Sequence, residues 1–477
     1  MEEQKPPSEG AAAPAAKGKG LWIGIAVVVV VVLLLLALVL TGFFNPPVPE
    51  EEVLRIGTVL SLTGTSGLEV FGPNNLRGAQ LAVKEINAAG GVLGRPIEVV
   101  SEDDGGVEAT ATARAQKLVT TNRVDALIGA VGSGFCAAVL EVTKANSVVQ
   151  VSASCTSPIF SNLTYTGGWF FRTAPSDALQ GVVAANYSYT VRGWTTMVAL
   201  GNNNPYGNGL ANVFKTEFER LGGTVTAYSL PLNLASYTSD LSAAFGSTPP
   251  EAVYMAEYPT DGLKVMRDWA ANPAWASIEW LFSEGVLEQA GFVDKLPAQG
   301  IDNTTLRTFQ GSAPGAYLGI VGGRYDDFVA RYRAEYGATA DPGLFTSNAY
   351  DAVYLIASAA QKAGRATGAD IKAQLRSVAT PTGTIVTGDE WSTIVARFAA
   401  GGDIDYDGAS GALNLDQYGD PLSGYAIWGI NATNRIYTVA EYNETTVVEM
   451  LGAPPAAAIG AVTSFASEVI AAASREA

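Results

Sequence analysis

Residues 75–104 (NLRGAQLAVKEINAAGGVLGRPIEVVSEDD) constrain the fold of this chain more than any other segment. Four apolar residues recur there at helical spacing, namely Ala79, Ala82, Val83 and Ile86. Gly90 and Gly91 end that helix, and residues 96–100 then predict a buried strand that closes on acidic residues. Because residues 55–64 (RIGTVLSLTG) supply an earlier strand, the segment predicts a strand–helix–strand unit.

The same alternation of strand and helix continues along the chain. Strands are expected at 124–129, 147–152, 196–200, 224–230, 252–255 and 278–282, and helices at 109–119, 135–146, 178–191, 209–221, 240–245, 261–271, 325–336 and 347–363. Such alternation is typical of an α/β fold with a parallel, doubly wound sheet. The chain has 477 residues, enough for two lobes of roughly 150–200 residues, each with its own core.

Charge and composition exclude several classes of function. The formal net charge is −17 and no basic run occurs outside the N-terminal flank, so nucleic-acid binding is not expected. The chain has no histidine, which removes histidine-dependent triads and imidazole metal sites. A hydrolase on a doubly wound fold would also need a GxSxG elbow, which the sequence lacks. We therefore expect a protein that is not an enzyme and needs no cofactor.

An uncharged apolar run at residues 21–44 predicts a membrane anchor. At about 1.5 Å per residue, a helix of this length crosses a hydrocarbon core of roughly 30 Å with some tilt. A cleaved signal peptide is the alternative, but it would have a shorter apolar region followed by a small-residue cleavage site. Lys17 and Lys19 precede the run, so residues 1–20 should stay in the cytoplasm, and the linker at 45–52 and everything after it should lie outside the cell.

The segments described above resemble one known family. The pattern GAQLAVKEINAAGGVLGR, followed by acids at 103–104, is similar to the opening of type 1 periplasmic binding proteins, the branched-chain amino-acid receptors of ABC transporters. The resemblance covers roughly residues 53–440 and implies two Rossmann-like lobes joined by a three-crossing hinge. It assigns 53–173 and 307–411 to lobe 1 and 174–306 and 412–445 to lobe 2, and it gives no role to the tail at 446–477.

Two loops are candidates for binding the charged ends of a ligand. Ser133 and Gly134 lie between an expected strand and an expected helix, where free N–H groups suit an anion, although a plain helix cap would have the same sequence. The resemblance implies that they bind an α-carboxylate. Residues 152–158 (SASCTSP) would otherwise be an ordinary Ser/Thr turn. There the resemblance implies contacts from the backbone of Cys155 and the hydroxyl of Thr156, with Cys155 replacing the family's alanine.

The resemblance implies four further ligand contacts. Phe71 would cover the ligand side chain from lobe 1, and Tyr206 and Tyr258 would line the cleft on lobe 2, although single aromatic residues are usually core. Glu284 follows an expected strand end, where the family has an acid that pairs with the ligand's ammonium group. This place agrees with the general rule that open α/β sheets bind ligands beyond the carboxyl ends of their strands.

Cys136 and Cys155 are the only cysteines in the sequence. Both follow the expected membrane run, and outside the cell disulfides form and persist. They flank neighbouring strand ends, so a disulfide between them would join the two loops expected to bind the carboxylate. We expect this disulfide, and the alternative is a pair of buried thiols.

The sequence therefore predicts an extracytoplasmic, membrane-anchored solute-binding receptor that closes by a hinge on a small amino acid, with the branched-chain type favoured, and delivers it to an ABC permease. A ligand-sensing ectodomain, or a receptor for an amide or a carboxylic acid, is the alternative. No metal is expected. Asp403, Asp405 and Asp407 imitate a calcium loop, but Asn414 stands where the loop needs a bidentate glutamate, which favours a polar turn.

Overall fold

The structure of the protein, a computed structural model, describes residues 53–319 and 323–451. The expected anchor at 21–44 and the linker at 45–52 lie outside the described residues, as does the tail from 452 onward. None of the helices in the described ranges combines the length and the apolar character that crossing a bilayer requires. The described residues belong to one unit, whose two lobes are described in turn.

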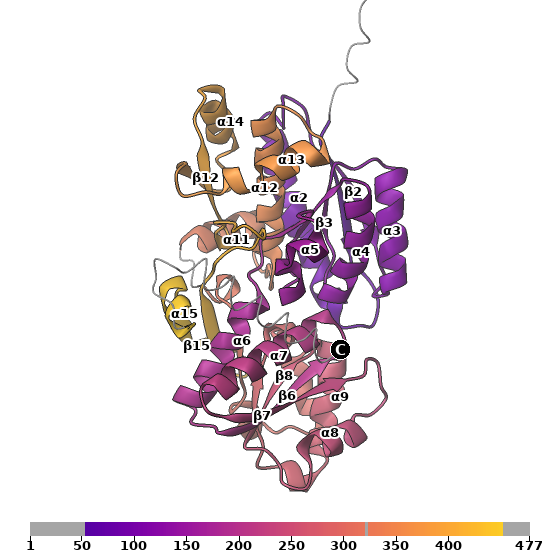
Figure 1. Ribbon diagram of the computed structural model, residues 1–477, viewed down its shortest axis with the longest axis vertical. Helices are drawn as coiled ribbons and strands as arrows, with labels where there is room; N and C mark the ends of the chain where they lie inside the picture. Colours follow the sequence, from indigo (N-terminus) through magenta and orange to yellow (C-terminus); the bar gives the residue numbers. More distant parts are fainter. Residues whose placement is uncertain (1–52, 320–322, 452–477) are drawn as a thin grey trace, which may run out of the picture. The chain divides into compact units, whose positions relative to one another are not determined.

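Lobe 1 is built on a five-stranded sheet in the order β2-β1-β3-β4-β5, with every neighbouring pair parallel (Figure 1). Its strands are β1 (Arg55–Leu60), β2 (Glu98–Asp103), β3 (Ala126–Gly129), β4 (Val149–Ser152) and β5 (Phe170–Arg172). The helices between them are α2 (Gly72–Ala88), α3 (Glu108–Thr120), α4 (Ser133–Ala145) and α5 (Leu163–Thr166). The expected α/β fold with a parallel sheet is confirmed.

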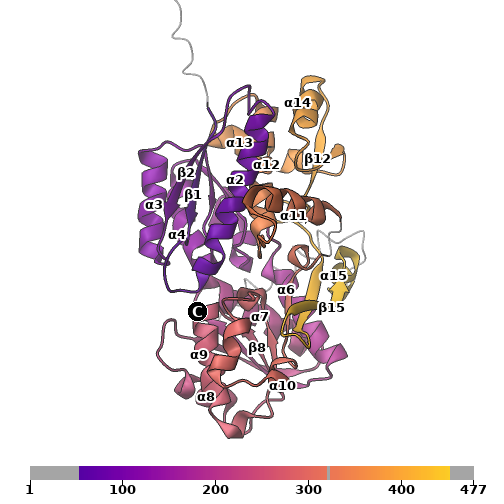
Figure 2. The same ribbon diagram turned by 180° about the vertical axis from the view of Figure 1, so that it is seen from behind.

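The two faces of this sheet carry separate hydrophobic clusters, because successive side chains of a strand point to opposite sides. Leu127 of β3 belongs to the cluster that contains α3 and α4, which lie side by side in Figure 1. Its neighbours Ala126 and Ile128 belong to the cluster that contains α2 and α12 (Thr346–Ala363). A helix from the later part of the chain therefore completes the core of lobe 1, and Figure 2 shows α12 beside α2.

Lobe 2 contains a seven-stranded sheet in the order β15-β14-β10-β9-β8-β6-β7. Its strands are β6 (Thr196–Asn202), β7 (Thr224–Leu230), β8 (Ala252–Ala256), β9 (Glu279–Phe282), β10 (Gln310–Pro314), β14 (Tyr425–Ile430) and β15 (Ile436–Tyr442). β7, β6, β8, β9 and β10 are parallel, whereas β14 pairs antiparallel with both β10 and β15. The helices are α6 (Asp177–Asn186), α7 (Pro205–Arg220), α8 (Thr238–Phe245), α9 (Pro259–Ala270), α10 (Asn303–Leu306) and α15 (Glu444–Met450).

The segment between β10 and β14 returns to lobe 1. It contains α11 (Gly323–Tyr336), α12, α13 (Gly368–Gln374) and α14 (Trp391–Ala399), with a small sheet of β11 (Thr384–Val386), β12 (Ile404–Gly408) and β13 (Gly411–Ala412). Short helical turns complete the described chain: η1 (Leu68–Val70), η2 (Pro158–Ser161), η3 (Tyr187–Val191), η4 (Pro273–Trp275), η5 (Glu284–Val286), η6 (Val293–Gln299), η7 (Ala316–Leu318) and η8 (Arg376–Val378).

The chain passes between the lobes three times within the described residues: after β5, after β10 and before β14. Two of these crossings are hydrogen-bonded to each other, because the Gly315 N–H donates to the Gly424 carbonyl at 3.0 Å. The third also contacts the first, because the Tyr425 hydroxyl donates to the Ser176 carbonyl at 2.8 Å. The three crossings therefore lie side by side and are joined by hydrogen bonds.

Two of the expected lobe boundaries need correction. β10 pairs with β9 and β14, so lobe 2 extends to Pro314, whereas the sequence placed the return to lobe 1 at residue 307. Lobe 1 in turn extends beyond residue 411, because Leu413 and Leu415 are buried in the lobe 1 cluster. Both shifts have the same cause: short polar or glycine-rich segments on either side of a crossing carry no periodic signal that says which sheet they join.

Candidate ligand-binding site

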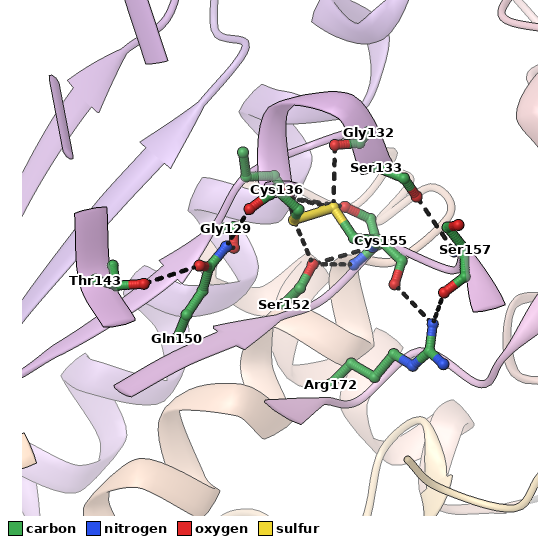
Figure 3. Close-up of a disulfide and its surroundings, with 12 residues drawn as sticks. Gly129, Gly132, Ser133, Cys136, Thr143, Gln150, Ser152, Cys155, Ser157 and Arg172 are labelled. Atoms are coloured by element: carbon green, nitrogen blue, oxygen red, sulfur yellow. Dashed lines mark hydrogen bonds between the residues drawn. A yellow bond between two sulfur atoms is a disulfide. The ribbon is translucent and has the colours of Figure 1, made fainter. Parts of the chain in front are cut away.

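The N-terminus of α4 forms one wall of the candidate site. Gly132 precedes it with a φ of 86°, and a Cβ at this position would lie 2.8 Å from Leu68 Cδ1 and 3.1 Å from the Tyr258 hydroxyl, so glycine is required. Ser133 begins the helix and is buried, and its Oγ accepts a hydrogen bond from the Ser157 N–H at 3.2 Å (Figure 3). The expected position of Ser133 between a strand and a helix is confirmed, and its contact with a ligand stays a prediction.

The segment between β4 and η2 forms a second wall. Cys155 and Thr156 are buried in it. Cys155 forms a disulfide with Cys136 of α4, with their Cα atoms 6.4 Å apart, so the expected disulfide is confirmed (Figure 3). The Cys155 N–H also donates to Ser152 Oγ at 3.0 Å. The disulfide and these hydrogen bonds therefore hold the peptide that carries Thr156 against the N-terminal turn of α4.

Two tyrosines from lobe 2 lie against each other. The rings of Tyr206 and Tyr258 are stacked, with centroids 5.2 Å apart. Asn204 caps α7 by accepting the Tyr206 N–H at 2.9 Å, so α7 begins earlier than the expected residue 209 and Tyr206 lies in its first turn. The Tyr206 hydroxyl lies 2.7 Å from Ser283 Oγ and accepts the Gly285 N–H at 3.1 Å. Tyr206 thereby joins α7 to the segment that carries Glu284.

The two lobes contact each other at these walls. Ser157 of lobe 1 donates its hydroxyl to the Pro205 carbonyl of lobe 2 at 2.7 Å. The Tyr258 hydroxyl lies beside Gly132 and the Ser133 N–H. Burial and then the charge of Glu284 raise the pKa of Tyr258, whereas the Ser133 N–H lowers it. A neutral tyrosine of lobe 2 therefore lies at the positive end of α4.

Glu284 is a buried acid at the end of β9. The Gln180 amide donates a hydrogen bond to its carboxylate. Burial raises the pKa of Glu284 to about 7, although Gln180, the backbone and the hydroxyls of Tyr206 and Thr156 lower it. The sequence placed Glu284 directly after a strand end, and the structure confirms that position.

Asp177, at the start of α6, is a second buried acid next to Glu284. Neither of its carboxylate oxygens has a hydrogen-bond partner among the described residues. Burial, followed by the charge of Glu284, raises the pKa of Asp177 well above its ordinary value, whereas the Thr156 hydroxyl and Arg172 lower it. Thr156 acts here by proximity, without reaching hydrogen-bond geometry. A buried acid without hydrogen-bond donors, next to a second buried acid, is an arrangement that a cationic group would neutralise.

The remaining expected residues lie around this centre. Phe71 is buried in the hydrophobic cluster that also contains Leu68, the neighbour of Gly132. Gly134 lies in the first turn of α4, where a Cβ would meet only the flexible carboxylate of the exposed Glu108, and its contact with a ligand stays a prediction. The structure thus brings the α4 N-terminus, Thr156, both tyrosines and Glu284 together. The contact of Phe71 with a ligand stays a prediction.

The three aspartates that imitate a calcium loop lie on or beside β12. Asp403 pairs with Lys362 at 2.7 Å, and Asp407 pairs with Arg324. Carboxylates that face lysine and arginine along a strand form ion pairs, and this is not the geometry of a calcium loop.

Asp177 and Arg172 belong to the site, but the sequence did not indicate their roles. Asp177 follows the capping residue Ser176, and an acid in the first turn of a helix is ordinary. Arg172 ends a strand of phenylalanines and has its guanidinium fully buried, hydrogen-bonded to the carbonyls of Cys155 and Ser157 (Figure 3). An arginine inside an apolar strand was the one available signal, because such a residue is rarely buried unless it is paired.

Comparison with known proteins agrees with this architecture. A family model described as periplasmic binding protein matches residues 53–399. BasB of Halobacterium salinarum, a substrate-binding protein of a chemotactic signal transduction system, is 26% identical over 387 residues, which cover 78% of this chain and 86% of BasB. A Leu/Ile/Val-binding protein homolog of Brucella abortus is 28% identical over 309 residues, which cover 62% of this chain and 77% of the homolog.

Solved structures share the fold. The leucine binding protein LivK of Thermotoga maritima has a TM-score of 0.67 at 23% identity, covering 82% of this chain and 99% of LivK. A solute binding protein of an ABC transporter from R. palustris, in complex with benzoate, has a TM-score of 0.63 at 19% identity, covering 82% of this chain and 96% of that protein. The relatives are described as binding proteins. The chain belongs to the periplasmic binding protein family, in the type 1 group that includes the branched-chain amino-acid receptors.

Proposed function

We propose that the protein is an extracytoplasmic receptor that binds a small amino acid between its lobes, with the branched-chain type favoured, and delivers it to an ABC permease. One observation carries this proposal: Thr156 adjoins both the buried acids Asp177 and Glu284 and the N-terminal turn of α4, where N–H groups are free to bind an anion. An amino acid has an ammonium group that the two acids can neutralise and a carboxylate that the N–H groups of α4 can bind.

The cost of burying charge supports a zwitterion over a simple acid. An unpaired charge buried in protein costs several kcal/mol, so each end of the ligand needs a partner when the lobes close on it. The carboxylate would bind Ser133 and the α4 N-terminus, and the ammonium would bind Glu284 and Asp177. A plain carboxylic acid, such as the benzoate of the R. palustris structure, would leave the two acids without a cation.

The walls of the site favour an apolar side chain. The stacked rings of Tyr206 and Tyr258, together with Leu68, bring aromatic and aliphatic surface to the place where the lobes meet, and Phe71 belongs to the same hydrophobic cluster as Leu68. Apolar surface of this kind stabilises a hydrocarbon side chain by about 25 cal/mol per Å² buried. The name of the Brucella relative, a Leu/Ile/Val-binding protein homolog, agrees with this preference.

Thermal unfolding with matched ligands tests the proposal. L-leucine at a hundred times its Kd should raise the stability of the protein by about 2.7 kcal/mol. The deaminated analogue 4-methylpentanoate and benzoate should give smaller shifts, because they bring no cation to Glu284. A larger shift with either acid than with any amino acid would contradict the amino-acid assignment and support the carboxylic-acid alternative.

A sensory role is a second candidate, favoured by one comparison. BasB, which matches most of this chain, is described as part of a chemotactic signal transduction system. The loaded receptor would then contact a transducer in place of a permease. Cross-linking of the full chain in native membranes distinguishes the two, because it recovers either permease subunits or a chemotaxis transducer as the main ligand-dependent product.

We further propose that residues 21–44 anchor the receptor in the cell membrane, with the binding lobes outside. The support is the uncharged apolar sequence of this run and the lysines before it. Mass spectrometry of the protein from native membranes should recover peptides from residues 1–20. A mature N-terminus near Asn45 would show instead that the run is removed as a signal peptide.

A further inference from the structure

Arg172 has every hydrogen-bond donor of its guanidinium in use. An arginine has five N–H donors, and here five hydrogen bonds are formed, all at 2.7–3.1 Å. Three of them go to side chains, two to the Asp420 carboxylate and one to Ser161 Oγ. Arg172 and Asp420 are both buried, so this bidentate pair is shielded from solvent and salt.

The other two bonds of Arg172 go to the peptide that carries Thr156. The guanidinium donates to the Cys155 carbonyl at 3.1 Å and to the Ser157 carbonyl at 3.0 Å, one on each side of Thr156 (Figure 3). Cys155 is linked to α4 through its disulfide, and the hydroxyl of Ser157 is bonded to lobe 2 through Pro205. The orientation of the Thr156 hydroxyl therefore depends on a peptide whose flanking carbonyls are hydrogen-bonded to Arg172.

Asp420 connects this cation to the hinge. It lies shortly before the third crossing, and the Arg172 N–H donates to the neighbouring Gly419 carbonyl at 3.0 Å. Asp177 lies on the first crossing, and its backbone N–H donates to the Thr156 carbonyl at 2.8 Å, so it is bonded to the same peptide that Arg172 holds. There the charge of Arg172 lowers the pKa of Asp177, which burial and Glu284 raise. The other titratable groups that act with Asp177 are the hydroxyls of Tyr206, Tyr254, Tyr258 and Tyr425. Arg172 is the one cation in this set.

We propose that Arg172 is a positioning residue for ligand binding: held by Asp420, it fixes the peptide that carries Thr156 and supplies the positive charge that faces Asp177. The part that concerns Thr156 rests on the proposed function, whereas the part that concerns Asp177 does not. Two substitutions distinguish these two parts of the proposal. Arg172→Lys keeps the charge but cannot hold two carbonyls and both carboxylate oxygens at once. Asp420→Asn keeps the shape of the partner but removes its negative charge.

The first measurement uses the ligand-free full chain. Selective ¹³C labelling of aspartate carboxyls, with Asp177→Asn to assign the signal, follows the titration midpoint of Asp177. Asp420→Asn should lower this midpoint, because the charge of Arg172 is then less compensated, and Arg172→Met should raise it, because the cation is gone. A purely structural role would move both variants the same way, since loosening the site lets water in and lowers the midpoint in each. Shifts in the same direction, or no shift, would overturn the proposal.

The second measurement uses L-leucine as the probe in calorimetry. Arg172→Lys should weaken leucine binding by about tenfold or more, equivalent to about 1.4 kcal/mol, with a smaller change in the Asp177 midpoint than Arg172→Met causes. Arg192→Lys is the matched control, because Arg192 also pairs with an acid, Glu279, and lies outside the site. Unchanged leucine affinity in Arg172→Lys would overturn the positioning role. Should wild-type protein bind neither leucine nor any other amino acid, the proposed function fails, and the Asp177 titration alone decides this inference.

Discussion

At the scale of single residues, the charge of Glu284 separates amino acids from plain acids. Glu284→Gln keeps the shape and the amide-bonding partner Gln180 but removes the charge that would neutralise an ammonium. Amino-acid binding should weaken by about 2–5 kcal/mol, because the ammonium would be buried without its partner. Calorimetry with L-leucine and 4-methylpentanoate measures this effect. Glu279→Gln, at the exposed first residue of β9, the strand that precedes Glu284, should bind as the wild type does.

The carboxylate end of the ligand gives a second residue-scale prediction. Replacing Ser133 and Thr156 together by alanine removes two hydroxyls from the loops that face the expected carboxylate. The loss should be roughly 1.5–3 kcal/mol for each hydroxyl that bonds the anion. Isothermal titration against leucine measures it, and Thr112→Ala on the exposed face of α3 serves as the control. An unchanged Kd in the double variant would place the carboxylate elsewhere.

At the scale of elements, the disulfide joins α4 to the segment after β4. The cysteines are 19 residues apart in the sequence, and a loop of this size contributes about 3 kcal/mol to stability. Cys136→Ala with Cys155→Ala should therefore lower the free energy of unfolding by about this amount, and it should also weaken leucine binding because the peptide of Thr156 is less restrained. Denaturant unfolding measures the first effect. Reduced wild-type protein should have the same free energy of unfolding as the variant. If oxidised wild-type protein has that same free energy, the prediction is contradicted.

The elements themselves were largely predictable from the sequence, because their signals are local. The helix expected at 109–119 is α3 (Glu108–Thr120), and the strand expected at 224–230 is β7 (Thr224–Leu230). The helical period of apolar residues and the glycines that end helices specify such elements without tertiary contacts. β10 was missed because its sequence, QGSAP, has neither alternation nor branched residues, and only pairing with β9 and β14 makes it a strand.

The site was predictable only in part, because only some of its residues lie in local sequence patterns. Ser133 and Glu284 lie at strand ends, so the rule for open sheets locates them from sequence order. Asp177 becomes important only because the fold of lobe 2 brings the start of α6 next to Glu284, which is far away in the sequence. The pairing of Arg172 with Asp420 spans an even longer separation. No local pattern encodes contacts of this range, so they had to come from the tertiary structure.

At the scale of the whole molecule, stability should depend on pH through its shifted acids. The chain has no histidine, so between about pH 5 and 8 the side chains that titrate are carboxyls with raised pKa values, such as Glu284 at about 7 and Asp351 and Asp416 at about 6. A raised pKa means that the folded state holds a proton that the unfolded state has released. The ligand-free protein should therefore lose stability as pH rises from the ordinary carboxyl pKa of about 4 to about 7, and its stability should level off above pH 7. Calorimetric Tm values measured from pH 5 to 8 check this, and Glu284→Gln should flatten the slope.

Ligand affinity should follow pH in the opposite direction. Burial raises the pKa values of Asp177 and Glu284, so an ammonium group that binds beside them should displace a proton from this pair of acids. Leucine binding should therefore release protons below pH 7 and tighten as pH rises from 6 to 8, with a slope that approaches tenfold in Kd per pH unit for each proton released. Calorimetry in buffers of different ionisation enthalpy measures the release directly. Glu284→Gln should abolish most of it, whereas Glu279→Gln should not. Tighter binding at pH 6 than at pH 8 would mean that the ligand meets protonated acids, which would fit a neutral or anionic ligand and not an amino acid.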